Sequence, residues 1–209
     1  MKNLDSYDFL EEEVERIKTG IEGVDKLFEL GIPSGASVML SGGTGSGKTI
    51  MGLQILAEKA SKGKKCLYMS FEESEKNLLR HMQRFGWNPR KLMESGNLVV
   101  KRYSPFVLRR EVGSELKRER GEINTHAGST FLPQNFEPDF IVVDSLSSVL
   151  NAFTDEGMEY RKYVEDLFRY LEDLDCTTFL ISETLEDSTK YSPTGVEEFL
   201  ADGVIVLYN

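Results

Sequence analysis

The residues with the clearest chemistry form one run, Ser41–Thr49, with the sequence SGGTGSGKT. It matches G-x-x-x-x-G-K-[ST], the pattern of the phosphate-binding P-loop, without a mismatch. Backbone N–H groups can surround phosphate oxygens only where no Cβ intrudes, and the glycines meet that condition. Lys48 adds a full charge for the β- and γ-phosphates, and the Thr49 hydroxyl can ligate Mg²⁺. The run therefore predicts a nucleoside-triphosphate site.

The segments on either side of this run suit a P-loop. Ser37–Leu40 is a short apolar strand, and Ile50–Ala57 is apolar at helical spacing and contains no proline. A P-loop requires this strand–loop–helix context, because the N-terminus of the helix also attracts phosphate. Besides Asp144, the nucleotide contacts expected from the motif are Gly43, Thr44, Gly45, Ser46, Gly47, Lys48, Thr49 and Ile50.

Three carboxylates follow predicted strands. Asp144 ends the apolar run Phe140–Val143, the place of a Walker B aspartate that holds the metal at the carboxyl edge of a sheet. An N-cap for the next turn is the alternative. Glu72 and Glu73 follow the strand Cys66–Ser70. Their mutual repulsion would raise the pKa of one and favour a proton acceptor, but a solvated helix start would also favour glutamate.

The chain alternates strands and helices, which indicates an α/β fold with a mostly parallel central sheet and helices on both faces. One predicted helix carries Leu78, Leu79, Met82 and Phe85 on a single face. We expect one domain over residues 1–209, with an acidic lead-in at 1–18 and a loop insertion at 121–138. The predicted strands are Ser37–Leu40, Cys66–Ser70, Leu98–Tyr103, Phe140–Asp144, Thr178–Ser182 and Val204–Tyr208.

Composition limits the classes of function. The 209 residues include 35 acidic and 25 basic ones, and a net charge of −10 argues against a surface devoted to nucleic acid. No apolar run approaches the roughly 20 residues that span a membrane, and the polar N-terminus does not resemble a signal peptide. Cys66 and Cys176 are expected to be buried and reduced, which favours a cytoplasmic protein. His81 and His126 stand alone and are expected in loops or at the surface.

Several segments together resemble the KaiC-like branch of the RecA-type P-loop ATPases. Besides the P-loop they are Thr19–Asp25 (TGIEGVD), Ser70–Ser74 (SFEES), Phe85–Trp87 (FGW), Val143–Ser147 (VDSLS) and Gly195–Phe199 (GVEEF). The similarity spans residues 16–208. It implies a RecA-like core, ATP with Mg²⁺ as ligands, and an ATP-promoted ring of identical subunits, usually a hexamer.

The resemblance also implies roles for individual residues. Lys48 would act on the phosphates, while Thr49 and Asp144 would hold Mg²⁺. Glu72 and Glu73 match the paired catalytic glutamates of the family, with Glu72 favoured as the residue that activates water. Ser182-Glu183 corresponds to a segment that senses the γ-phosphate in RecA-type proteins.

The sequence departs from the family pattern in three places. The clock proteins of the family carry two tandem copies of this domain, whereas this chain carries one, which is similar to their N-terminal, ATPase half. It lacks the Ser-Thr stretch of the other half, so clock-type autophosphorylation is not expected. Residues 121–138 look like an insertion. The sequence stops at Asn209, before a segment that in relatives carries a Lys/Arg pair; hydrolysis is expected to be slow or partner-dependent unless the natural protein is longer.

Three functions remain open at this point. The first is a slowly hydrolysing ATPase that regulates a protein partner, and the second is a nucleotide-binding assembly subunit with little turnover. The third is a DNA recombination or repair ATPase, for which the basic segment 109–120 is the main argument. The loops that would bind DNA, 151–159 and 183–195, contain one basic residue, Lys190, so nucleic acid is not the expected partner.

Overall fold

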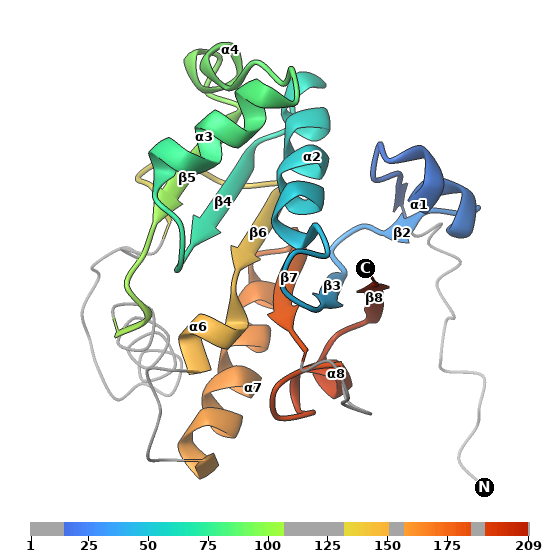
Figure 1. Cartoon of the computed structure of the whole chain (residues 1–209), viewed down its shortest axis with the longest axis vertical. Helices are drawn as coiled ribbons and strands as arrows, with labels where there is room; N and C mark the ends of the chain where they lie inside the picture. The colour runs from blue at the N-terminus through green and yellow to red at the C-terminus, as the bar shows by residue number, and fades with distance from the viewer. Residues whose placement is uncertain (1–14, 107–131, 151–156, 185–190, 209) are drawn as a thin grey trace, which may run out of the picture.

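The computed structural model describes residues 15–106, 132–150, 157–184 and 191–208 (Figure 1). A six-stranded sheet lies at its centre. Its strands are β3 (Ser37–Gly42), β4 (Cys66–Ser70), β5 (Leu98–Arg102), β6 (Phe140–Asp144), β7 (Thr177–Glu183) and β8 (Gly203–Leu207). The order across the sheet is β5-β4-β6-β7-β3-β8, and all neighbours are parallel. The prediction of a parallel α/β sheet is therefore confirmed.

Helices cover both faces of this sheet. One face packs against α2 (Lys48–Ser61), α3 (Glu75–Arg84) and α4 (Pro89–Glu94). The opposite face packs against α6 (Leu146–Leu150) and α7 (Gly157–Asp173), and α8 (Glu197–Leu200) contacts α7. Before β3, the antiparallel pair β1 (Arg16–Ile17) and β2 (Ile32–Pro33) flanks α1 (Glu22–Leu27), to one side of the sheet (Figure 1).

Strand β6 shows why its sequence is continuously apolar. Phe140 and Val142 belong to the core cluster under α2, whereas Ile141 and Val143 belong to the cluster under α7. Successive side chains of a strand point to opposite faces, so a strand covered on both faces has no solvent-facing position. Strands β4 and β6 have the bounds that the sequence predicted. Their carboxyl ends bring Ser70 and Asp144 to adjacent positions.

One predicted core residue is wrong. The sequence predicts Phe85 on the same helical face as Leu78 and Met82, which are buried, but α3 ends at Arg84 and Phe85 is 56% exposed. The chain turns at Gly86, where φ is +79°, so Phe85 leaves the helical face and its ring stacks on Trp87 with centroids 5.1 Å apart.

Other sequence-based expectations have mixed outcomes. Cys66 and Cys176 are free and buried as predicted, and burial raises the pKa of both thiols. The basic segment 109–120 and most of the acidic lead-in lie outside the described residues. In the expected insertion, residues 132–138 form no helix or strand. Within the described part of the chain, no helix is long and apolar enough to span a membrane.

Candidate nucleotide-binding site

The P-loop connects the carboxyl end of β3 to the first turn of α2. Gly45 and Gly47 have φ angles of +83° and +95°, a conformation that residues with a Cβ rarely adopt. Gly47 is the N-cap, so α2 begins at Lys48 and points its positive N-terminal end back at the loop. This is the local geometry of a concave anion site made from backbone groups.

Lys48 lies inside this loop. It is 7% exposed, and its ammonium donates hydrogen bonds to the carbonyl oxygens of Gly42 at 2.9 Å and Gly43 at 2.8 Å. A buried ammonium is costly unless such acceptors surround it. The contacts therefore keep a positive charge at the place where the motif predicts phosphate.

Asp144 reaches the same place from the end of β6. Its Oδ2 accepts hydrogen bonds from the Thr49 hydroxyl at 2.9 Å and from the Tyr68 hydroxyl at 2.5 Å. Burial raises the pKa of Asp144 to about 6; the bonds from Tyr68 and Thr49 lower it, and the charges of Glu72 and Glu73 raise it. The pKa of Asp144 thus stays above its ordinary value, so the charged carboxylate costs free energy that its two hydrogen bonds do not fully offset.

The two glutamates after β4 have different partners. Oε1 of Glu72 accepts hydrogen bonds from the hydroxyls of Ser145 and of Ser148, the latter at 2.6 Å. Oε2 of Glu73 lies 3.2 Å from Nε2 of His81. Each glutamate is thus oriented by a separate element, Glu72 by the segment after β6 and Glu73 by α3.

A cleft of about 320 Å³ connects these groups. Of the residues predicted from sequence, Gly43 and Ser46 belong to the same loop but do not line the cleft. The lining residues are Thr44, Gly45, Gly47, Lys48, Thr49, Ile50, Glu72, Glu73, His81, Asp144, Ser145, Ile181 and Glu183. The structure therefore brings together glycines, a lysine, hydroxyl groups and four acids from segments that are distant in the sequence.

Sequence reasoning missed several partners of these residues. His81 was expected alone, but it lies against Glu73, because α3 runs back past the end of β4. Tyr68, Ser145 and Ser148 were not singled out. The strand register brings Tyr68 to Asp144, and the turn after β6 brings the two serines to Glu72. Neither the register nor the turn can be predicted from the spacing of residues in the sequence. A polar tyrosine inside an otherwise apolar buried strand was the one available signal for Tyr68.

The segment assigned to phosphate sensing lies at the rim. Ser182 is fully buried opposite Ser41 in the β3–β7 register. Glu183 lines the cleft, and its backbone N–H donates to the hydroxyl of Ser147 at 2.9 Å. This contact connects the end of β7 with α6, which also carries a partner of Glu72.

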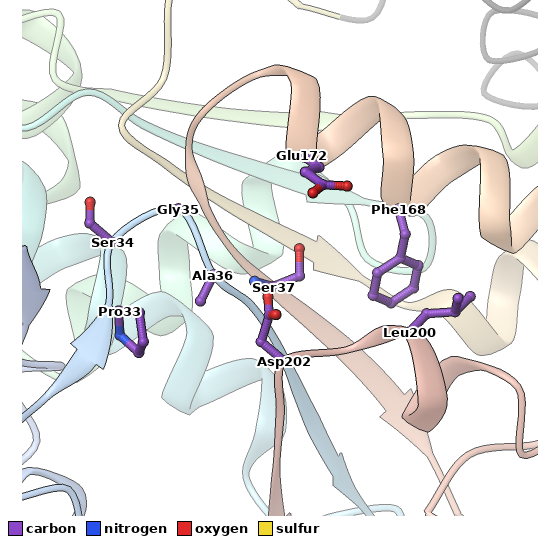
Figure 2. A pocket seen from close by; sticks show the side chains of 9 residues that line it. All are labelled: Pro33, Ser34, Gly35, Ala36, Ser37, Phe168, Glu172, Leu200 and Asp202. Carbon is purple, nitrogen blue, oxygen red and sulfur yellow. Dashed lines mark hydrogen bonds between the residues drawn. The ribbon is translucent and has the colours of Figure 1, made fainter. Parts of the chain in front are cut away.

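A second pocket lies at the other edge of the sheet, before β3 and β8 begin (Figure 2). Its wall includes the ring of Phe168 and the carboxylates of Glu172 and Asp202. Asp202 accepts a hydrogen bond from the Ser37 N–H at 2.8 Å, which ties the start of β8 to β3. None of the P-loop residues line this pocket, so it is separate from the cleft described above.

The oxygen donors of the cleft fit a magnesium ion. Mg²⁺ prefers oxygen ligands and in nucleotide sites usually takes only one or two from the protein, with phosphates and water completing the shell. The Thr49 hydroxyl and the Asp144 carboxylate are such donors and lie 2.9 Å apart. Among the described residues, no group of three or more His, Cys, Asp or Glu is placed to hold a metal ion.

A parallel sheet with a P-loop after β3 and an acid at the end of β6 defines a RecA-like P-loop protein. More specifically, the chain belongs to the KaiC family of ATPases, because the family model "ATPase: KaiC" matches residues 17–209. A solved structure of a KaiC-like protein from the archaeon Pyrococcus horikoshii OT3 is 31% identical with a TM-score of 0.72, covering 93% of this chain and 81% of that one.

Curated relatives give the same family. The chain is 31% identical over 202 residues to the circadian clock protein KaiC3 of Synechocystis, and 29% identical over 199 residues to the circadian clock oscillator protein KaiC of Synechococcus elongatus. Both matches cover 94% of this chain but only 38% and 37% of the relative. The chain therefore spans less than two fifths of the length of these clock proteins.

Proposed function

We propose that this protein binds Mg-ATP and hydrolyses it slowly to ADP and phosphate. The observation that carries the proposal is the convergence, in one cleft, of the P-loop, the Thr49–Asp144 contact and two oriented glutamates. Membership of the KaiC ATPase family supports the same activity. A phosphate-binding loop alone would suit many ligands, but the added acids suit a reaction at the γ-phosphate.

The P-loop and Lys48 bind the phosphates in this proposal. Backbone groups around Gly45 and Gly47 surround the anion, and the Lys48 ammonium exchanges its contacts with Gly42 and Gly43 for phosphate oxygens. Thr49 and Asp144 hold Mg²⁺, which when bound neutralises charge on the β- and γ-phosphates.

Glu72 orients and deprotonates the attacking water. The hydroxyls of Ser145 and Ser148 fix its carboxylate at the cleft, and such fixed orientation is what a general base requires. Glu73 supports it from the side of α3, where His81 holds its carboxylate. Both acids keep the catalytic assignment that the sequence suggested, with Glu72 as the primary base.

The nucleotide state is proposed to control self-assembly into a ring, and through it the binding of a protein partner. Several large apolar side chains are strongly exposed, among them Leu27 (81%), Leu30 (74%), Phe199 (86%) and Tyr208 (82%). They belong to α1, the loop after it, α8 and the residue after β8, segments that lie on the β8 side of the sheet in Figure 1. Single exposed apolar side chains are common on protein surfaces, but several on one side of the molecule suit a surface that a neighbouring subunit covers.

The test is ATP hydrolysis measured together with sedimentation mass, with and without Mg-ATP, for the wild type and Lys48→Ala. The proposal expects slow turnover and a larger, ATP-promoted particle, with both effects lost in Lys48→Ala. A wild-type protein that binds ATP as a monomer and does not hydrolyse it would contradict the ATPase role.

A further inference from the structure

Tyr68 is fully buried in the core and adjoins the cleft through its contact with Asp144. Strands β4 and β6 are parallel neighbours in which Tyr68 pairs with Val142 and Ser70 pairs with Asp144. The ring of Tyr68 lies on the α2 face of the sheet, is fully buried, and reaches along the strand direction to the carboxylate of Asp144. A residue that the P-loop motif does not include thus contacts an acid of the cleft.

The close approach of α2 holds this ring in place. A Cβ at Gly52 would lie 3.1 Å from Val142 Cγ1 and 3.6 Å from Tyr68 Cε2, so the helix packs on the sheet with almost no space between them. Water does not reach the Tyr68 hydroxyl there, and a buried hydroxyl without a partner is costly. Its acceptor is Asp144 Oδ2, at 2.5 Å.

The donors of Asp144 are unevenly distributed. The hydroxyls of Tyr68 and Thr49 both donate to Oδ2, at 2.5 Å and 2.9 Å. Among the described residues, none donates a hydrogen bond to Oδ1. Two donors on one oxygen fix the rotation of the carboxylate and leave the other oxygen for a cation or for the water that surrounds it.

We infer that Tyr68 is a positioning residue for magnesium: its hydroxyl fixes Oδ2 of Asp144 so that Oδ1 is set for the cation before the cation arrives. The inference rests on the proposed binding of Mg-ATP and adds to it a residue outside the P-loop and the three acids. Removing an outer partner of a metal site typically weakens metal binding about 10- to 100-fold.

A purely structural role for Tyr68 predicts a different result, and the molecule contains a matched control. The Tyr160 hydroxyl donates to Glu197 Oε1 at the same distance, 2.5 Å, and both residues are buried. This second pair lies between α7 and α8 and does not line the cleft. Tyr160→Phe therefore removes the same atom from the same kind of pair without touching the cleft.

The experiment is calorimetric titration of ATP into wild type, Tyr68→Phe and Tyr160→Phe, in EDTA and at a series of Mg²⁺ concentrations. Tyr68→Phe is expected to keep the wild-type affinity for ATP in EDTA and to need about tenfold more Mg²⁺ for half of the magnesium-dependent gain. Tyr160→Phe should need the wild-type concentration. In an Asp144→Asn background, Tyr68→Phe should have no further effect on the magnesium response.

The outcomes separate this inference from the proposed function. Each of the two tyrosine substitutions removes one oxygen and keeps the ring, and thermal unfolding of each variant checks the fold. If wild type and Tyr68→Phe show the same magnesium response, or if Tyr160→Phe shifts it equally, the positioning role is overturned while ATP binding stands. If the wild type does not bind ATP in either condition, the proposed function fails, and this inference fails with it.

Discussion

Tyr68 with Asp144 and Tyr160 with Glu197 are two buried pairs with the same distance between hydroxyl and carboxylate, 2.5 Å, but the net pKa of the acid is shifted in opposite directions. The pKa of Asp144 is raised to about 6, whereas the pKa of Glu197 is lowered from its ordinary value of 4.5. Burial raises the pKa of both acids, so the opposite net directions depend on how far the surrounding groups offset it.

The difference lies in the surrounding groups. Glu197 accepts hydrogen bonds on both oxygens, from Tyr160 on Oε1 and from Thr194 on Oε2 at 2.7 Å, and its own backbone and Ser192 lower its pKa further. The two donors of Asp144 share one oxygen, and Glu72 and Glu73 add negative charge nearby. A carboxylate with donors on both oxygens stabilises the fold, whereas one with a spare oxygen and a raised pKa is typical of a binding site.

The largest predicted effect is on turnover and concerns Glu72, which lines the same cleft as Asp144. Glu72→Gln keeps the shape and the contacts to serine but cannot take a proton, so turnover should fall about 10²- to 10⁴-fold with little change in unfolding free energy. Steady-state hydrolysis and urea unfolding measure the two quantities. Glu73→Gln is the matched control and should lose less; an equal or greater loss there would reverse the assignment of the base.

The next largest predicted effect is a loss of folding stability when the pair of Tyr160 and Glu197 is disrupted. Glu197→Gln removes the charge that strengthens its hydrogen bonds, and we expect the free energy of unfolding to fall by about 3 kcal/mol. Urea unfolding measures the loss. Turnover per folded molecule should remain within about twofold of wild type. The contrast between the two pairs would break down if Glu197→Gln lost activity without losing stability.

Asp144→Asn should show the opposite pattern. Raising the pKa of Asp144 from 3.8 to about 6 corresponds to a penalty of about 3 kcal/mol at neutral pH, since one pKa unit is about 1.4 kcal/mol. The amide carries no such penalty but forms weaker hydrogen bonds, so we expect the nucleotide-free variant to be about 1 kcal/mol more stable. The magnesium-dependent gain in ATP affinity should disappear. A large loss of stability in Asp144→Asn would show instead that Asp144, like Glu197, mainly stabilises the fold.

The smallest effects are in the pH dependence of stability without nucleotide. The folded state holds the Asp144 proton more tightly than the unfolded chain, so the stabilisation from this group is complete below about pH 4 and is lost as pH rises through about 6. Glu197 has the opposite sign: its contribution is present above its ordinary pKa and is lost as pH falls through its lowered folded value.

Urea midpoints measured between pH 3 and 7 can separate these two contributions. The stability difference between Asp144→Asn and wild type should grow with rising pH, and that between Glu197→Gln and wild type should shrink as pH falls. Parallel curves for either variant would contradict the corresponding pKa direction.

The parts of the fold that depend on local pattern could be predicted from sequence. The run Phe140–Asp144 gave the bounds of β6, and the spacing of the glycines and Lys48 indicated the loop. Short helices such as α1 and α4 have six residues each, too few for a 3.6-residue period to be evident, and they were not predicted.

Sequence identified the site residues that belong to recognisable motifs, but not the residues that contact them in the fold. Lys48, Thr49 and Asp144 belong to known motifs, and the structure brings them together. The orienting groups, Tyr68, His81 and the serines after β6, depend on strand register and helix direction, which are properties of the tertiary fold. Sequence could identify the acids but could not say which of them has its hydrogen bonds satisfied.

The position of β3 in the sheet has a consequence for synthesis of the protein. β3 lies between β7 and β8, and the Ser37 N–H donates to Asp202, which follows it by 165 residues. Chains emerge from the ribosome at about 5–20 residues per second, and pairings distant in sequence form late. Both edges of the strand that carries the P-loop are therefore paired only after β8 has been synthesised, and we expect bound nucleotide to assist folding only from that point on.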